Sequence, residues 1–141
     1  MPTETLNTFS ALDIRVYYED TDAAGVVYYA NYLKFLERGR TEWLRHLGVD
    51  QSRLAQDEQR MFVVKTVEIQ YRKPARLDDV ITVCSKVTRV GRASVNFKQI
   101  IKCSGVSLCE SVVQVCCVDT NTFRPAPFSR ELRTLLEKVQ E

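Results

Sequence analysis

The stretch that decides the fold runs from residue 16 to residue 47 and reads VYYEDTDAAGVVYYANYLKFLERGRTEWLRHL. It opens with a polar turn at residues 19–25. After the turn, apolar side chains recur at steps of three and four, which predicts one amphipathic helix of about five turns over residues 26–47. Gly48 is the expected C-cap of this helix, and Gly39 on its apolar side predicts close packing against a sheet.

The rest of the chain predicts mainly strands. One strand precedes the turn, at residues 12–18, and residues 51–60 form a polar connection with some helical character. Residues 61–119 are rich in β-branched side chains and divide into four strands, which we expect to form an antiparallel meander wrapped round the helix. The turn signals that separate these strands lie at residues 74–79, 90–92 and 104–105. An amphipathic stretch at residues 129–139 is expected to cap the sheet or to fray.

Alternation of apolar and polar side chains assigns the strand residues to faces. Val67, Ile69 and Tyr71 share one face, and Lys65 interrupts their alternation with Val63. The interruption indicates either a lysine that lines a cleft or a β-bulge. Residues 112–118, by contrast, are largely apolar on both faces, as in a central strand or at a subunit interface.

Length and composition indicate a single α+β domain. The chain has 141 residues, of which 45% are hydrophobic and 27% charged, values typical of globular proteins. The net charge of +2 gives no argument for a nucleic-acid partner. Residues 1–10 lack the pattern of a signal peptide, and no stretch of about 18 apolar residues occurs. We therefore expect a cytoplasmic protein without a membrane span, with peripheral attachment to a membrane-bound partner left open.

Cysteine and histidine usage argues against a metal site. The five cysteines are an odd number without C-x-x-C spacing, and His46 is the one histidine. A zinc site of the ordinary Cys/His type therefore has too few ligands, and we expect reduced, partly buried thiols and no metal or cofactor.

The turn before the helix is the place where chemistry is expected. Asp20 and Asp22 precede the unpaired amide groups of the first helical turn, which together with the helix dipole can stabilise an anion. On spacing alone, the more common role of such an aspartate is to cap the helix or to stabilise the turn. A Mg²⁺ site for phosphoryl transfer ranks low, because the chain has no further acidic cluster and no phosphate-binding loop.

Two segments carry a family resemblance. Residues 18–28, YEDTDAAGVVY, and residues 31–42, NYLKFLERGRTE, resemble the first strand and central helix of the hotdog-fold acyl-CoA thioesterases, the family of 4-hydroxybenzoyl-CoA thioesterase. They are most similar to the branch associated with the Tol-Pal envelope system. YRKPARLDD at 71–79 and RVGRAS at 89–94 continue the resemblance, which covers roughly residues 12–125. It implies a single hotdog domain over residues 1–141, in which one long central helix is wrapped by a curved antiparallel sheet.

The resemblance also implies a catalytic centre. In the family, the aspartate at the position of Asp22 acts on the thioester carbonyl as nucleophile or as general base, and the resemblance leaves both routes open. The backbone amide at the position of Tyr29 donates to the oxyanion. The Tol-Pal branch often has histidine at this position, so that any contribution of an imidazole is absent here.

Substrate contacts are implied less specifically. The 3′-phospho-ADP of coenzyme A is anionic, so its site should offer basic side chains at a surface turn, although each arginine taken alone is more often a solvated charge. Lys73 and Arg76 are weaker candidates of this kind. Tyr18 is a candidate for the acyl pocket, although an aromatic residue at a strand end more often belongs to the core. The expected substrate-binding residues are Tyr18, Gly25, Lys65, Arg89, Arg92 and Ser94.

The leading functional hypothesis is therefore an acyl-CoA thioesterase that works as a homodimer or homotetramer, with a groove between protomers for the substrate. A hotdog dehydratase is the alternative enzyme, but it would need a catalytic histidine, and His46 is poorly placed. The other alternative is a non-catalytic module that binds acyl-CoA or acyl-carrier protein, or that joins envelope-associated proteins. The identity of the acyl group does not follow from the sequence.

Overall fold

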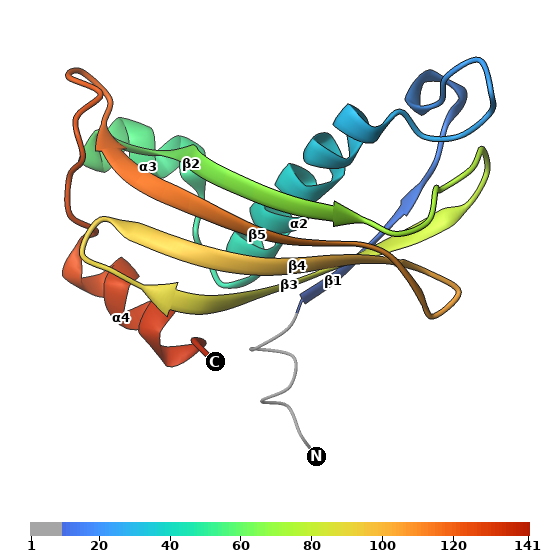
Figure 1. Cartoon of the computed structure of the whole chain (residues 1–141). Coiled ribbons are helices and arrows are strands. Elements are labelled where there is room, and N and C mark those ends of the chain that lie inside the picture. Colours follow the sequence, from blue (N-terminus) through green and yellow to red (C-terminus); the bar gives the residue numbers. More distant parts are fainter. Residues whose placement is uncertain (1–9) are drawn as a thin grey trace.

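The computed structural model describes residues 10–141 as a five-stranded antiparallel sheet curved round one long helix (Figure 1). Residues 1–9, which hold most of the segment searched for a signal peptide, lie outside the described residues. Within residues 10–141, no helix is both long and apolar enough to cross a membrane. The elements are β1 (Ser10–Arg15), α2 (Tyr32–His46), α3 (Gln51–Glu58), β2 (Arg60–Tyr71), β3 (Val80–Val90), β4 (Ser94–Cys103), β5 (Val106–Asp119) and α4 (Arg130–Lys138), with 3₁₀ turns at Tyr18–Asp20 and Tyr29–Asn31.

The strand order corrects one part of the expected meander. The order is β1-β3-β4-β5-β2, so β3, β4 and β5 do form a meander, but β2 pairs with β5 and not with β3. The connection from β2 to β3 is held elsewhere, because Val27 N–H donates to Ala75 O at 2.8 Å and Val26 bridges to Arg76. This connection therefore crosses to the segment before the helix, and the outer edge of β2 stays unpaired in the described chain.

The helix begins later than its periodicity predicts. Residues 26–28 are not helical, since Val26 and Val27 pair with the β2–β3 connection and Tyr28 has extended backbone angles. A 3₁₀ turn then leads into α2 at Tyr32. The other end agrees with the prediction, because Gly48 has a φ of 92° and follows the last turn of the helix as a C-cap.

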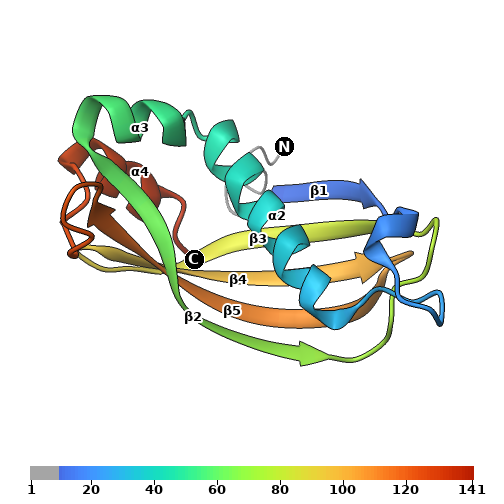
Figure 2. The same ribbon diagram turned by 90° about the horizontal axis from the view of Figure 1, so that it is seen from above.

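Helix α2 packs mainly over β1, β3 and β4 (Figure 2). The close approach expected at Gly39 is present, because a Cβ atom there would lie 2.5 Å from Val83 Cγ1. Trp43, one turn further on, is fully buried. The inner face of β2 is covered less well, and the side chains of Val64, Val67 and Tyr71 remain 47%, 38% and 46% exposed.

The structure decides two alternatives that the sequence left open, one at Lys65 and one at the final helix. The register between β2 and β5 shifts between Val64 and Thr66, so Lys65 is the extra residue of a β-bulge. The final helix α4 caps the sheet and does not fray, since Leu132 and Leu136 are buried against it and Ser129 Oγ accepts a hydrogen bond from Leu132 N–H at 3.2 Å. Helices α3 and α4 occupy one end of the sheet, and the turn with Asp22 occupies the other (Figure 1).

Candidate active site

The turn that carries Asp22 is closed by its own hydrogen bonds. Asp22 N–H donates to Val26 O at 2.9 Å, and Gly25 N–H donates to Asp22 O at 3.0 Å. The φ of Gly25 is 79°, a left-handed value that favours glycine. Oδ1 of Asp22 accepts from Ala24 N–H at 2.9 Å, whereas Oδ2 accepts no hydrogen bond from the described residues. The exposed side chain thus keeps one carboxylate oxygen for another partner.

Asp20 has a different task, although it is only two residues away. Its Oδ2 accepts from Tyr17 N–H and its Oδ1 accepts from Asn31 Nδ2, both at 2.8 Å. Its carbonyl accepts from Tyr28 N–H at 3.3 Å. Asp20 therefore fastens the turn to the start of the helix and has no free carboxylate oxygen.

The first helical turn offers unpaired amides beside this turn. The N–H groups of Tyr29 and Ala30 donate to no acceptor within residues 10–141, as expected at a helix start. A bridge between Thr21 and Val27 brings the Asp22 turn alongside the same segment. The dipole of the helix adds the equivalent of about half a positive charge at this end. A free carboxylate oxygen and free amide donors therefore lie at one end of α2.

A cleft of about 240 Å³ adjoins these amides. Tyr71 Oη donates to Tyr29 O at 3.1 Å, and the centroids of the two rings are 5.9 Å apart. Burial raises the pKa of Tyr71 and of Tyr32, so both phenols stay protonated. Tyr32 Oη accepts from Ala75 N–H at 2.9 Å. Sequence reasoning missed Tyr71 as a site residue, and its place on the inner face of β2 was the only signal. The cleft is lined by Val27, Tyr29, Tyr32, Tyr71, Arg72, Lys73 and Pro74.

The structure brings together only some of the expected substrate contacts. Gly25 shares the turn with Asp22, and Lys73 lines the cleft next to Tyr29. Tyr18 is 81% exposed, so the interpretation as a core residue is wrong, and it does not line the cleft. Lys65 is exposed on the bulge of β2.

The expected nucleotide-binding residues lie far from Asp22 within one chain. Arg89, Arg92 and Ser94 belong to the turn between β3 and β4, whereas β3 begins at the end of the sheet that holds Asp22. The 11 residues of β3 span roughly 35 Å at about 3.3 Å per residue. A single protomer therefore does not unite the two groups.

Other groups within residues 10–141 form no second candidate catalytic centre. His46 is exposed at the last residue of α2, roughly 20 Å from the helix start at 1.5 Å per residue. No group of three His, Cys, Asp or Glu side chains in the described part of the chain is placed to hold a metal ion. All five cysteines are free thiols, and burial raises the pKa of Cys109 to about 11, which makes this thiol unreactive near neutral pH.

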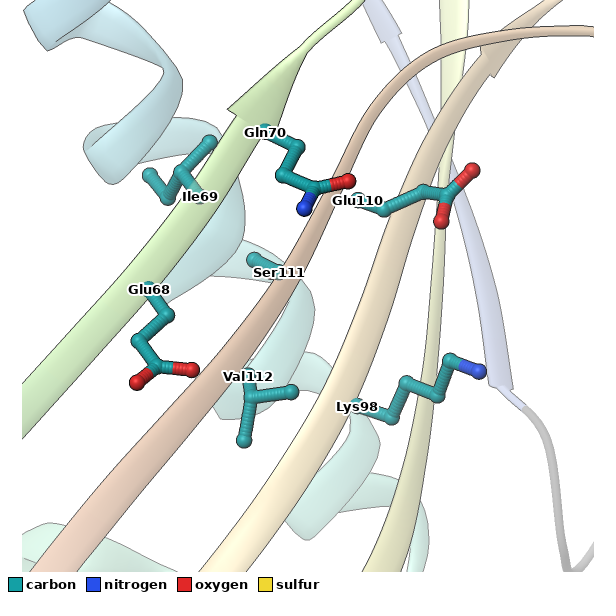
Figure 3. Close-up of a pocket in the computed structure, with 7 residues that line it drawn as sticks. All are labelled: Glu68, Ile69, Gln70, Lys98, Glu110, Ser111 and Val112. Atoms are coloured by element: carbon teal, nitrogen blue, oxygen red, sulfur yellow. The ribbon is translucent and has the colours of Figure 1, made fainter.

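A larger hollow, of about 560 Å³, lies on the outer face of the sheet. Figure 3 shows that Glu68, Lys98, Glu110 and Val112 point away from α2 there. None of the candidate catalytic or substrate-binding residues lines this hollow. We therefore place the candidate active site at the start of α2.

The comparisons with known proteins agree with this fold. Residues 16–136 match the thioesterase-like superfamily. The acyl-CoA thioesterase YbgC of Haemophilus influenzae is 45% identical over 134 residues, 95% of this chain and 98% of that protein. The acyl-CoA thioester hydrolase YbgC of Escherichia coli O6:H1 is 42% identical over 120 residues, 84% of this chain and 89% of that protein.

A solved structure shows the same architecture. The crystal structure of a probable thioesterase from Bartonella henselae superimposes with a TM-score of 0.82 at 34% identity, covering 86% of this chain and 99% of that one. A long helix wrapped by a five-stranded antiparallel sheet is thus confirmed as the hotdog fold, a fold of thioesterases. The chain belongs to the thioesterase-like superfamily, and YbgC proteins are among its relatives.

Proposed function

We propose that the chain hydrolyses acyl-CoA thioesters, with Asp22 as the catalytic carboxylate and the amides of Tyr29 and Ala30 as the oxyanion hole. The observation that carries the proposal is the difference in hydrogen bonding between the carboxylates of two neighbouring aspartates. Asp20 uses both carboxylate oxygens to hold the turn, and Asp22 keeps Oδ2 free beside unpaired amides. The names of the YbgC relatives supply the acyl-CoA substrate.

Two routes fit this geometry, and both need Asp22 ionised. As a nucleophile, Oδ2 attacks the thioester carbonyl, the C–S bond breaks, and the resulting mixed anhydride is hydrolysed by water. As a general base, Oδ2 takes a proton from a water molecule that attacks the same carbonyl, after which the C–S bond breaks, the acid is released and the departing thiolate of coenzyme A takes up the proton. In either route negative charge develops on the carbonyl oxygen, where one amide donor is worth about 3 kcal/mol of barrier.

A dimer would complete the nucleotide site. The free edge of β2 carries exposed Val63, Val64 and Val67, and pairing it antiparallel with its own copy would cover this edge. Antiparallel pairing reverses the ends of the second sheet. The β3–β4 turn of the partner subunit, with its Arg89 and Arg92, then lies at the end of the assembly that holds Asp22.

The alternatives are weaker on specific grounds. A dehydratase would need a histidine beside the acid, and His46 lies at the opposite end of α2 from Asp22. A non-catalytic module for acyl-CoA or acyl-carrier protein would give no reason for Asp22 to keep a free oxygen next to free amide donors.

The test is release of free thiol from a panel of short, long and aromatic acyl-CoAs by wild type and by Asp22→Asn. An asparagine Oδ1 can still accept from Ala24 N–H, so the turn should be retained. We expect a loss of at least a hundredfold, about 2.7 kcal/mol, with an unchanged melting temperature. Glu19→Gln, the same change at an exposed carboxylate in the same segment, should retain full activity.

Two outcomes would contradict the proposal. Equal turnover by Asp22→Asn and wild type would remove Asp22 from the mechanism. Binding of coenzyme A without turnover of any thioester by the wild type would favour the binding module.

A further inference from the structure

A second cavity opens between α2 and the inner faces of the strands that α2 covers least. It measures about 100 Å³. One side is formed by Arg40 and Leu44 of α2, and the other by Phe62 and Val64 of β2 together with Val115 of β5. We call this cavity the Arg40 slot. Its remaining walls are apolar except for Glu37, Thr41 and Gln51, of which Glu37 is exposed at the rim.

The guanidinium of Arg40 is the unusual feature of the slot. Its residue is only 8% exposed, yet no carboxylate lies within 4.0 Å of it in the part of the chain that is described. Its one hydrogen bond runs from Nη1 to Gln99 Oε1 at 3.0 Å. A guanidinium has five N–H donors, and a buried charge without a partner is costly. The remaining donors can thus serve an anion that enters the slot.

The hydrogen bonds of Gln99 fix the side chain that contacts the guanidinium. Gln99 Nε2 donates to Leu36 O at 2.9 Å and to Ser85 Oγ at 2.8 Å. These bonds fix the amide, so Oε1 is directed at the guanidinium. All of these groups are buried. Arg40 is therefore held in place by an uncharged hydrogen-bond partner. The carboxylate of Glu37, at the rim of the slot, acts on the guanidinium electrostatically but forms no ion pair with it within 4.0 Å.

An apolar track joins the slot to the candidate active site. Along the inner face of β2, the exposed side chains of Val64, Val67 and Tyr71 lead from the slot to the cleft beside Tyr29. From Tyr29 to Arg40 the helix advances roughly 16 Å, at about 1.5 Å per residue. An acyl chain with its carbonyl at the Tyr29 amide could follow this track toward Arg40.

We propose that the Arg40 slot receives the far end of the acyl group, and that Arg40 selects acyl chains carrying a carboxylate at the end remote from the thioester. The inference rests on the proposed function, since it names a substrate class for the same site. A carboxylate matches the planar fork of a guanidinium, and its neighbouring methylenes match the apolar walls. Arg40 is thus a specificity-determining residue.

The experiment compares acyl-CoAs in pairs of equal chain length, one with a terminal methyl group and one with a terminal carboxylate. Over a range of lengths, wild type should show a kcat/KM at least tenfold higher for the carboxylate at the length that reaches Arg40. Arg40→Met should lose this preference, so that the ratio of kcat/KM values within each pair falls to about one. Arg40→Lys should keep a reduced preference, and Arg38→Met, at an exposed neighbour on α2, should match wild type.

The same pairs are compared as ligand-induced shifts of the melting temperature in the Asp22→Asn protein. This second measurement decides the role of Arg40 even if no thioester is hydrolysed, so that its failure is distinct from failure of the proposed function. Equal responses to both members of every pair would overturn the proposal. So would a preference that survives in Arg40→Met, or an Arg40→Met protein that loses the native oligomer mass, since the guanidinium would then serve a subunit contact.

Discussion

Asp20 and Asp22, which are separated by one residue, differ in the hydrogen bonds of their carboxylates. Asp20 and Asp22 look alike in the sequence, where a capping role was the more common expectation for either. In the folded chain Asp20 accepts from Tyr17 N–H and from Asn31 Nδ2, whereas Asp22 leaves Oδ2 free. Asp20 therefore gives both carboxylate oxygens to the turn, whereas Asp22 gives only Oδ1, so a change to asparagine that keeps this acceptor should retain the turn.

Gly39 is a second position where one side chain decides the packing. Gly39→Ala gains helix propensity of about 1 kcal/mol, but the added methyl would lie 2.5 Å from Val83 Cγ1 in a filled core. Overpacking of this kind costs about 1–3 kcal/mol, so we expect a net decrease in the free energy of unfolding. Denaturant titration measures it. Lys34→Ala, at an exposed site on the same helix, should change stability by less than about 0.5 kcal/mol.

An increase in stability for Gly39→Ala would show that helix and sheet can separate at this point at little cost. Restoration by Val83→Ala in the same protein would locate the clash between these two side chains.

The site residues differ in how far the sequence predicts them. Asp22 and the Tyr29 amide follow from the resemblance and not from spacing, because an Asp-rich turn before a helix is common. Tyr71 and Arg72 are separated from Tyr29 by about forty positions, and only the folded sheet brings them to the cleft. Arg40 lies in the segment 31–42 that carries the resemblance, and the sequence gives no sign of its role. Its burial follows from Gln99, a polar residue on an otherwise apolar face of β4.

At the scale of elements, local pattern predicted the strands but not all of their neighbours. The turn signals between β2, β3, β4 and β5 all fall where the strands end. The position of β2 beside β5 and the pairing of Val27 with Ala75 are both contacts between distant segments, which no local periodicity contains. The same pairing unwinds the first predicted turn of the helix.

The bulge of β2 makes a further prediction at this scale. Lys65 is the extra residue, so its deletion would leave Val64 opposite Val115 and Val67 opposite Val113, with both still facing inward. We expect deletion of Lys65 to preserve cooperative folding, with a stability change of about 1 kcal/mol. Lys98 is an exposed lysine of β4 at a position where the strand has no bulge. Its deletion would move the side chains of half of that strand to the opposite face of the sheet.

Thermal unfolding followed by circular dichroism compares the two deletions. The protein without Lys98 should lose several kcal/mol, because one of the buried pairs around Phe97 or Ile101 must face outward. Equal effects of the two deletions would mean that the bulge at Lys65 is needed for folding and does not simply absorb an extra residue.

For the whole molecule, the separation between Asp22 and the β3–β4 turn is the main argument for assembly. Within one protomer the two regions lie at opposite ends of the sheet. The edge of β2 is also unpaired in the part of the chain that is described. Both features are explained at once if β2 pairs with its copy, because each site then takes its catalytic carboxylate from one chain and its nucleotide contacts from the other.

Subunit complementation tests this arrangement directly. Asp22→Asn and a double Arg89→Ala, Arg92→Ala variant should each be poorly active alone. When the two chains are co-expressed in equal amounts, half of the dimers should be mixed, and each mixed dimer has one intact site. Thiol release should therefore recover to about a quarter of the wild-type rate. Activity that stays at the mean of the two variants would place Asp22 and both arginines in the same site of the same chain, and would remove the reason for a shared site.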